Sequence, residues 1–331
     1  MSSRHAGRWL GWLAALAPVA LAAGIMAVLW TGAEPGHSVT TEVEAASGFP
    51  RTLVETFPDG STGRRVTLAA PPRRIVSALM ATDEILLDLV PPERIAALCY
   101  LSEKQNALIA DRVKSVKAFV DTDPERIIAL RPDLVFLASF TKQETKEMLQ
   151  NTGIPVFTFH CFDSLADIRR NVLTVGAAVG EDEKAKALVA DMDRRLAAVA
   201  AARPPRDQWP AVLAFGHDGW VAGKHTTLTD LLEAAGARNA AAEAGVEGHT
   251  QLSVEKVLTM APDYLLVMTG AGAMGPQGGG LLAHPGLAGL KAVREKRFLM
   301  VDANLLSCVS HHVVKAVEEI ARQLRPQGGQ P

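Results

Sequence analysis

Histidine and cysteine side chains that could bind a metal are spread over three separate segments of the sequence. His160 and Cys161 are adjacent, whereas His217 and Cys308 stand alone further along the chain. Imidazole and thiolate groups are good ligands for zinc, copper and iron. Because this spacing matches no established metal-binding motif, a shared site requires a fold that brings the segments together. His160, Cys161 and His217 are the candidate metal ligands.

The elements that must position these side chains alternate along the 331-residue chain. Short apolar runs that predict β-strands are followed by stretches with helical periodicity. The strand-like runs are residues 74–79, 95–100, 133–137, 155–159, 210–215, 263–268 and 297–301. Such alternation is typical of parallel sheets that are covered by helices on both faces.

Two segments of the chain, residues 123–137 and 253–267, repeat one pattern without a gap. Each begins with a helix-capping residue and has a glutamate two positions later. Each then ends in a Pro-Asp pair followed by an apolar strand. The glutamates are Glu125 and Glu255. The duplication predicts two lobes of similar topology.

One long helix is predicted between the two repeats, within residues 180–203. Leu188, Met192, Leu196 and Val199 recur at spacings of four, four and three, which places them on one helical face. A helix of about 20 residues is roughly 30 Å long. We therefore predict an α/β fold with two Rossmann-like lobes that contain parallel sheets. A rigid backbone helix joins the lobes, and a ligand cleft lies between them.

Residues that directly follow the predicted strands are the candidates for ligand binding. In parallel α/β sheets, ligands bind beyond the carboxyl ends of the strands. With two such lobes, we expect those ends to face each other across the cleft. The candidate ligand-binding residues are Met80, Tyr100, Phe140, His160, His217, Trp220, Asn304 and Cys308.

Charge and motif content argue against several functions. The formal net charge of −2 gives no electrostatic basis for binding nucleic acid. Residues 78–82, after the first predicted strand of the alternating pattern, lack the Gly-x-Gly-x-x-Gly of a dinucleotide site. The glycine-rich residues 270–280 lack the lysine and serine of a phosphate-binding loop. With no Ser/His/Asp order or carboxylate pair at a plausible site, we predict that the chain is not an enzyme.

The N-terminal residues predict export from the cytoplasm. Arg4, His5 and Arg8 precede an uncharged apolar run over residues 9–30. This pattern is typical of an export signal, and the run is nearly long enough to span a bilayer. We therefore expect a periplasmic or extracytoplasmic protein, either released by cleavage or anchored to the inner membrane by residues 9–30. No cysteine precedes Cys99, which argues against a lipid anchor.

The predicted domain boundaries follow from these patterns. They are an export signal or anchor at 1–33, a linker at 34–50, an N-terminal lobe at 51–163, helices including the backbone helix at 164–203, a C-terminal lobe at 204–325 and a tail at 326–331. Three cysteines are too few for a disulfide framework, and the sequence leaves open whether any two of them pair.

The chain resembles the helical-backbone class of ABC-transporter substrate-binding proteins, whose members carry iron-siderophores, haem or cobalamin. The resemblance covers roughly residues 52–324. It rests on the Asp-Gly hairpin before residues 71–77, the two glutamate-containing repeats and the long helix. His284-Pro285-Gly286-Leu287, leading to Ala292-Val293, also matches.

The resemblance implies a mechanism of capture and delivery. The cleft would hold a metal chelate, and the loaded protein would dock on a membrane permease that works with its ATPase subunits. By their place in the motif, Glu125 and Glu255 would be the docking residues. The chelate is bound as cargo, so we expect no intrinsic cofactor, and we expect a monomer.

There are two alternatives, of which the first is a related binding function and the second is catalysis. A binding protein for a bare divalent ion, zinc or manganese, would need three or four ligands to converge in the cleft. An α/β enzyme is a remote alternative, because the sequence shows neither a cofactor loop nor a catalytic arrangement.

Overall fold

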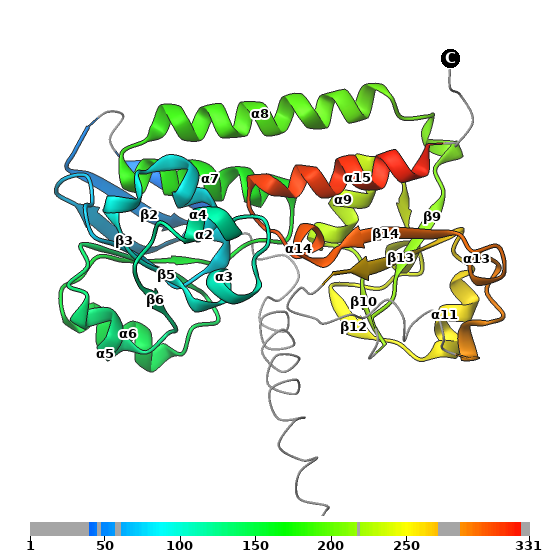
Figure 1. The fold of residues 1–331 in the computed structure, drawn as a ribbon, viewed down its shortest axis with the longest axis horizontal. Coiled ribbons are helices and arrows are strands. Elements are labelled where there is room, and N and C mark those ends of the chain that lie inside the picture. Colours follow the sequence, from blue (N-terminus) through cyan, green and yellow to red (C-terminus); the bar gives the residue numbers. More distant parts are fainter. Residues whose placement is uncertain (1–39, 45–47, 57–60, 217–218, 271–284, 326–331) are drawn as a thin grey trace, which may run out of the picture.

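The computed structural model describes residues 40–44, 48–56, 61–216, 219–270 and 285–325. Two α/β lobes lie side by side beneath one long helix, α8 (Asp182–Ala201) (Figure 1). Within the described ranges, no helix is both long and apolar enough to cross a membrane. The apolar residues 9–30 fall outside them.

The first lobe is built on a five-stranded parallel sheet in the order β6-β5-β4-β7-β8. Its strands are β4 (Ile75–Ser77), β5 (Ile95–Cys99), β6 (Phe119–Val120), β7 (Leu134–Ala138) and β8 (Val156–Phe159). The helices of this half are α2 (Met80–Leu89), α3 (Tyr100–Gln105), α4 (Ala110–Val113), α5 (Pro124–Ala129), α6 (Gln143–Asn151) and α7 (Leu165–Val179), with the 3-10 turn η1 (Pro92–Arg94).

The second lobe is built on a four-stranded parallel sheet in the order β11-β9-β13-β14, with a small antiparallel pair, β10 and β12, beside it. Its strands are β9 (Ala211–Ala214), β10 (Trp220–Ala222), β11 (Arg238–Asn239), β12 (His249–Gln251), β13 (Tyr264–Thr269) and β14 (Phe298–Asp302). Its helices are α9 (Thr227–Ala235), α10 (Ala240–Glu243), α11 (Val254–Met260), α13 (Lys291–Arg294), α14 (Ala303–Leu306) and α15 (Val314–Leu324). Three 3-10 turns accompany them, η2 (Arg206–Gln208), η3 (Pro285–Leu287) and η4 (His311–Val313). The predicted α/β fold with two parallel-sheet lobes is confirmed.

A third, antiparallel sheet joins the N-terminal residues to the first lobe, in the order β1-β2-β3. β2 (Arg51–Thr56) and β3 (Thr62–Leu68) form the predicted hairpin, whose turn at 57–60 lies outside the described residues. β1 (Thr40–Glu44) pairs with β2, although we expected residues 34–50 to be a linker. The threonines and valine of β1 favour a strand, and β2 offers it a free edge.

Helix α8 contributes one apolar face to the cores of both lobes. Ala185 and Leu188 pack with the first lobe's core. Met192, Leu196 and Val199 pack with the second lobe's core. The apolar stripe predicted for this helix is therefore confirmed, and successive parts of it serve different lobes.

Ion pairs hold α8 at both ends. Near its start, the almost fully buried guanidinium of Arg51 contacts the Asp182 carboxylate at 2.8 Å and donates to the Ala177 carbonyl at 2.7 Å. Toward its end, Arg195 donates two hydrogen bonds to Glu318 of α15, at 2.6 and 2.7 Å. The first contact belongs to the N-terminal lobe and the second to the C-terminal lobe.

The sequence repeat is also a structural repeat. In both lobes the residue before the Pro-Asp pair has a positive φ, 48° in one and 44° in the other. The aspartate then accepts a hydrogen bond from a backbone amide at the start of the neighbouring strand, β4 in the first lobe and β9 in the second. Asp133 accepts from the Arg74 amide at 2.8 Å, and Asp263 accepts from the Ala211 amide at 2.8 Å. The same turn therefore leads into β7 and into β13.

A substitution at Gly176 in α7 should separate α7 from α8. A Cβ at Gly176 would lie 2.2 Å from the Ala185 Cβ. We expect Gly176→Ala to lower the free energy of unfolding by roughly 1–3 kcal/mol in urea denaturation. This overlap outweighs the helix-propensity gain of about 1 kcal/mol. Gly289→Ala is the control, because its Cβ would lie 3.7 Å from the nearest atom. Unchanged stability of Gly176→Ala would contradict the close packing.

Candidate functional site

The strand ends of the first lobe present four of the predicted ligand-binding residues. Met80 begins α2 and is separated from the end of β4 by two residues, and Tyr100 begins α3 directly after β5. Both side chains are partly exposed. Phe140 follows β7 and is 40% exposed, which is unusual for a phenylalanine. His160 follows β8 and is partly exposed.

His160 is connected to the antiparallel sheet. Its Nε2 lies 3.4 Å from the Glu55 carboxylate of β2. Glu55 is buried, and its other oxygen accepts a hydrogen bond from the Arg64 amide at 3.1 Å. The hydrogen bond from Arg64 holds the Glu55 carboxylate in place beside the His160 ring. A histidine that is paired with a carboxylate through one nitrogen can use the other to bind a metal.

The second lobe presents Trp220 and Asn304, both partly exposed. Trp220 begins β10. Asn304 lies in α14, where its side chain and its amide donate to Asp302 at 2.9 and 2.7 Å. Gly270 follows β13, and a Cβ there would lie 2.8 Å from an Asp302 oxygen. The ends of β13 and β14 are therefore packed together, whereas His217 lies outside the described residues.

Cys308 lies in a contact between the two lobes. Its side chain is almost fully buried, and its Sγ lies 3.1 Å from the Glu84 carboxylate of α2. Burial and this carboxylate raise the pKa of the thiol well above its usual value. We therefore leave Cys308 out of the proposed ligand site. Cys99, Cys161 and Cys308 are all buried, and no disulfide joins any two of them.

The Glu84 carboxylate is the centre of this contact, which the sequence analysis missed. One oxygen accepts from Ser310 as well as from Cys308, and the other accepts from Asn106 at 2.6 Å. Ser310 and Cys308 belong to the second lobe, whereas Glu84 and Asn106 belong to the first. The only local signal was an acidic pair, Asp83-Glu84, near a helix start, which is an ordinary feature of helices.

The neighbouring Asp83 is fully buried. Its carboxylate accepts hydrogen bonds from the Ser102 hydroxyl at 2.6 Å and the Cys99 amide at 2.9 Å. Burial raises the pKa of Asp83 to about 7, although these hydrogen bonds oppose the shift. Asp83 therefore fixes the start of α3, next to Tyr100, and is not directed at solvent.

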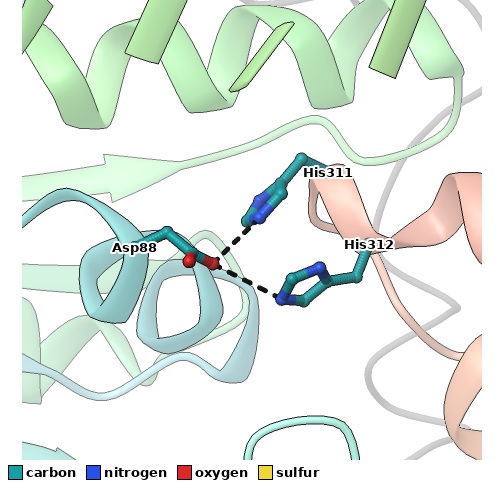
Figure 2. Close-up of side chains that lie close together, drawn as sticks. All are labelled: Asp88, His311 and His312. Atoms are coloured by element: carbon teal, nitrogen blue, oxygen red, sulfur yellow. Dashed lines mark hydrogen bonds and ion pairs between the residues drawn. The ribbon is translucent and has the colours of Figure 1, made fainter. Parts of the chain in front are cut away.

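A second polar cluster lies one helical turn further along α2. Asp88 contacts His311 and His312 of η4 (Figure 2). It also contacts the side chain of Arg112. Burial, and then the nearby His311, lower the pKa of His312 to about 3, so its ring is neutral at physiological pH. Hydrogen bonds from His311 and Arg112 hold the pKa of Asp88 well below its usual value, against the effect of burial.

Among the described residues, a group of three donor side chains could hold a metal ion. It consists of Asp88, His311 and His312. His160 and Cys161, two of the predicted metal ligands, belong to no such group within the same part of the chain.

Glu125 and Glu255 occupy equivalent positions on the two lobes. Each is exposed and lies in the first turn of a short helix, α5 or α11. Asp123 and Ser253 cap these helices by accepting hydrogen bonds from backbone amides, as predicted. Both helices lie on the side of the molecule away from α8 (Figure 1).

Two parallel-sheet lobes that are joined by one long helix define a binding protein of the helical-backbone type. A family model described as periplasmic binding protein matches residues 75–305, so the chain belongs to that family. The predicted family is confirmed, and with it the assignment as a substrate-binding component of an ABC importer and not an enzyme.

The chain is similar to two curated proteins over most of its length. A cobalamin-binding protein of Halobacterium salinarum is 29% identical over 271 residues, which cover 81% of this chain and 70% of that protein. YvrC of Bacillus subtilis, an uncharacterized ABC transporter substrate-binding lipoprotein, is 25% identical over 317 residues. This match covers 92% of this chain and 97% of YvrC.

A solved structure has the same fold. The periplasmic heme-binding protein RhuT from Roseiflexus sp. RS-1, in its apo form, is 26% identical. It superposes with a TM-score of 0.63 and matches 76% of this chain and 99% of its own.

Proposed function

We propose that this protein captures a corrinoid such as cobalamin outside the cytoplasm and delivers it to an ABC permease. The observation that carries the proposal is the 29% identity to a cobalamin-binding protein over 81% of this chain. The matched family model also spans the strand ends of both lobes.

The chemistry of the strand-end residues supports a neutral, flat ligand. Tyr100, Phe140 and Trp220 offer aromatic faces or edges, and Asn304 offers an amide. A corrin ring presents apolar faces and a rim of carboxamides, which these groups match. The six described candidates that remain (Met80, Tyr100, Phe140, His160, Trp220 and Asn304) include no arginine or lysine. Haem propionates or an anionic siderophore would favour a cation among them.

Haem is the second candidate. It is favoured by the similarity to RhuT and by His160, whose imidazole is a common axial ligand of haem iron. A bare zinc or manganese ion as cargo is less favoured, because His160 and Cys161 are not grouped with a third donor among the described residues.

The N-terminal segment would keep the protein near its permease. Residues 9–30 are apolar and follow a basic start, so we propose either a cleaved export signal or an anchor in the inner membrane. In both cases the two lobes lie outside the cytoplasm.

Purified protein should bind one equivalent of cyanocobalamin, measured by calorimetry and by thermal shift. Tyr100→Ala and Trp220→Ala should each weaken binding about 5- to 10-fold, because each removes an aromatic contact worth roughly 1–1.5 kcal/mol. Tyr264→Ala is the matched control, because Tyr264 lies at the opposite end of β13. It should leave the affinity unchanged.

Hemin serves as the competing ligand in the same titrations. Tight binding of hemin without binding of cyanocobalamin would move the assignment to haem. Failure to bind either compound would overturn the proposed cargo.

Docking on the permease is the second part of the proposal. Glu125 and Glu255 lie at matched positions of the repeat, and their helices are on one side of the molecule (Figure 1). Hydrogen bonds at the start of α11 lower the pKa of Glu255, so it is charged at neutral pH. Two exposed carboxylates of this kind suit basic residues on a permease, where they mainly affect orientation and association rate.

The double variant Glu125→Ala/Glu255→Ala should abolish uptake while its affinity for cyanocobalamin stays at the wild-type value. Uptake of labelled cobalamin by cells and calorimetry on purified protein measure the two effects. Glu183→Ala is the control, because Glu183 is also exposed in a first helical turn but belongs to α8. Normal uptake by the double variant would contradict docking through these glutamates.

A further inference from the structure

Asp88, His311 and His312 meet where the two lobes touch. Asp88 is near the end of α2 in the first lobe, and the histidines form the start of η4, which leads into α15 of the second lobe. Figure 2 shows both imidazole rings directed at the carboxylate. The Asp88 Oδ2 atom lies 3.0 Å from His311 Nε2 and 3.5 Å from His312 Nε2.

We propose that these three residues form a binding site for a divalent transition-metal cation of the zinc class, and that the cation connects the two lobes. This site is separate from the strand ends where the cargo is proposed to bind.

The distances between the donor atoms suit a tetrahedral ion. Zinc binds imidazole nitrogen at about 2.0–2.1 Å and carboxylate oxygen at about 2.0–2.2 Å, so neighbouring donors of a tetrahedral site lie roughly 3.3 Å apart. The Oδ2–Nε2 separations of 3.0 and 3.5 Å bracket this value. All three donor atoms also lie within 4.8 Å of one another. Only small side-chain movements are therefore needed to place a cation between them.

The donor set selects the class of metal. Two imidazoles and one carboxylate suit zinc, copper or nickel, whereas calcium and magnesium need mostly oxygen ligands. The two rings lie close together, with centroids 4.1 Å apart and planes tilted by 45°. Each ring can bind a cation through Nε2 in the tautomer that carries its proton on Nδ1. His311 is buried, and Asp88 and His312 are partly exposed, so water can supply the fourth ligand.

Arg112 positions the carboxylate. Its guanidinium contacts Asp88 Oδ1 at 2.9 Å and also donates to the Leu87 carbonyl. Arg112 pairs with the Oδ1 atom of Asp88. The Oδ2 atom is therefore the oxygen that faces the two histidines. The guanidinium also offsets part of the carboxylate charge, so the two imidazole nitrogens contribute much of the affinity. This again favours a nitrogen-preferring cation.

A cation at this place would restrain the lobes. The segment with η4 packs against α7 and α8, and α2 packs against α7. The site therefore lies at the junction of the lobes and close to the backbone helix. Ligands from both lobes would tie α2 to η4 and oppose their rotation apart.

Calorimetric titration of tag-free, chelator-treated full-length protein with zinc sulfate tests the proposal. We expect one equivalent of zinc to bind. His311→Gln, His312→Gln and Asp88→Asn should each weaken binding by about 100-fold or more. His225→Gln is the control, because His225 is exposed and also pairs with a carboxylate, Glu247. It should retain the wild-type affinity.

Cobalt(II) provides a second readout, because its visible absorption reports nitrogen ligation directly. A wild-type protein that takes up no zinc would overturn the proposal. Zinc affinity that is unchanged in His312→Gln would also overturn it, because His312 is only partly buried and its replacement should preserve the fold. Circular dichroism of each metal-free variant separates loss of the site from loss of structure.

Discussion

The arrangement of the whole molecule depends on α8 burying one face in two hydrophobic cores. Ala185 and Leu188 belong to the first core, and Met192 and Val199 to the second. A helix of 20 residues is about 30 Å long and resists bending, so its length sets the separation of the lobes. The sheets attach to it through α7 and α15. The strand ends that carry the proposed cargo site, and helices α5 and α11, are positioned as a consequence.

A second set of contacts joins the lobes beneath α8. Glu84 and Asp88 are one turn apart on α2, and both contact the segment 308–312. Buried polar contacts of this kind add little net stability, but they are costly to break singly and so favour one relative orientation. Together with α8, they leave little freedom for hinge motion. This agrees with the proposal that Glu125 and Glu255 are presented to a permease at a fixed spacing.

The sequence predicted the elements that depend on local pattern. The parallel strands other than the two-residue β6 and β11, the capped helices, the Pro-Asp repeat and α8 follow from periodicity and turn residues. It did not predict β1, which depends on the edge of β2, or the short α14 after β14. The contacts of Glu84 and Asp88 were also missed, because their partners are more than 220 residues away. His311 and His312 resembled an ordinary helix start, and only the fold places them beside Asp88.

The distance between α5 and α11, with and without cargo, tests most directly whether one rigid helix frames the binding site. Spin labels at Ala129→Cys and Thr259→Cys, both exposed, report this distance by pulsed electron resonance, and the native cysteines are buried. We predict that saturating cyanocobalamin shifts the distance by less than about 2 Å. A shift of many ångströms on binding would show a hinged closure and contradict the account.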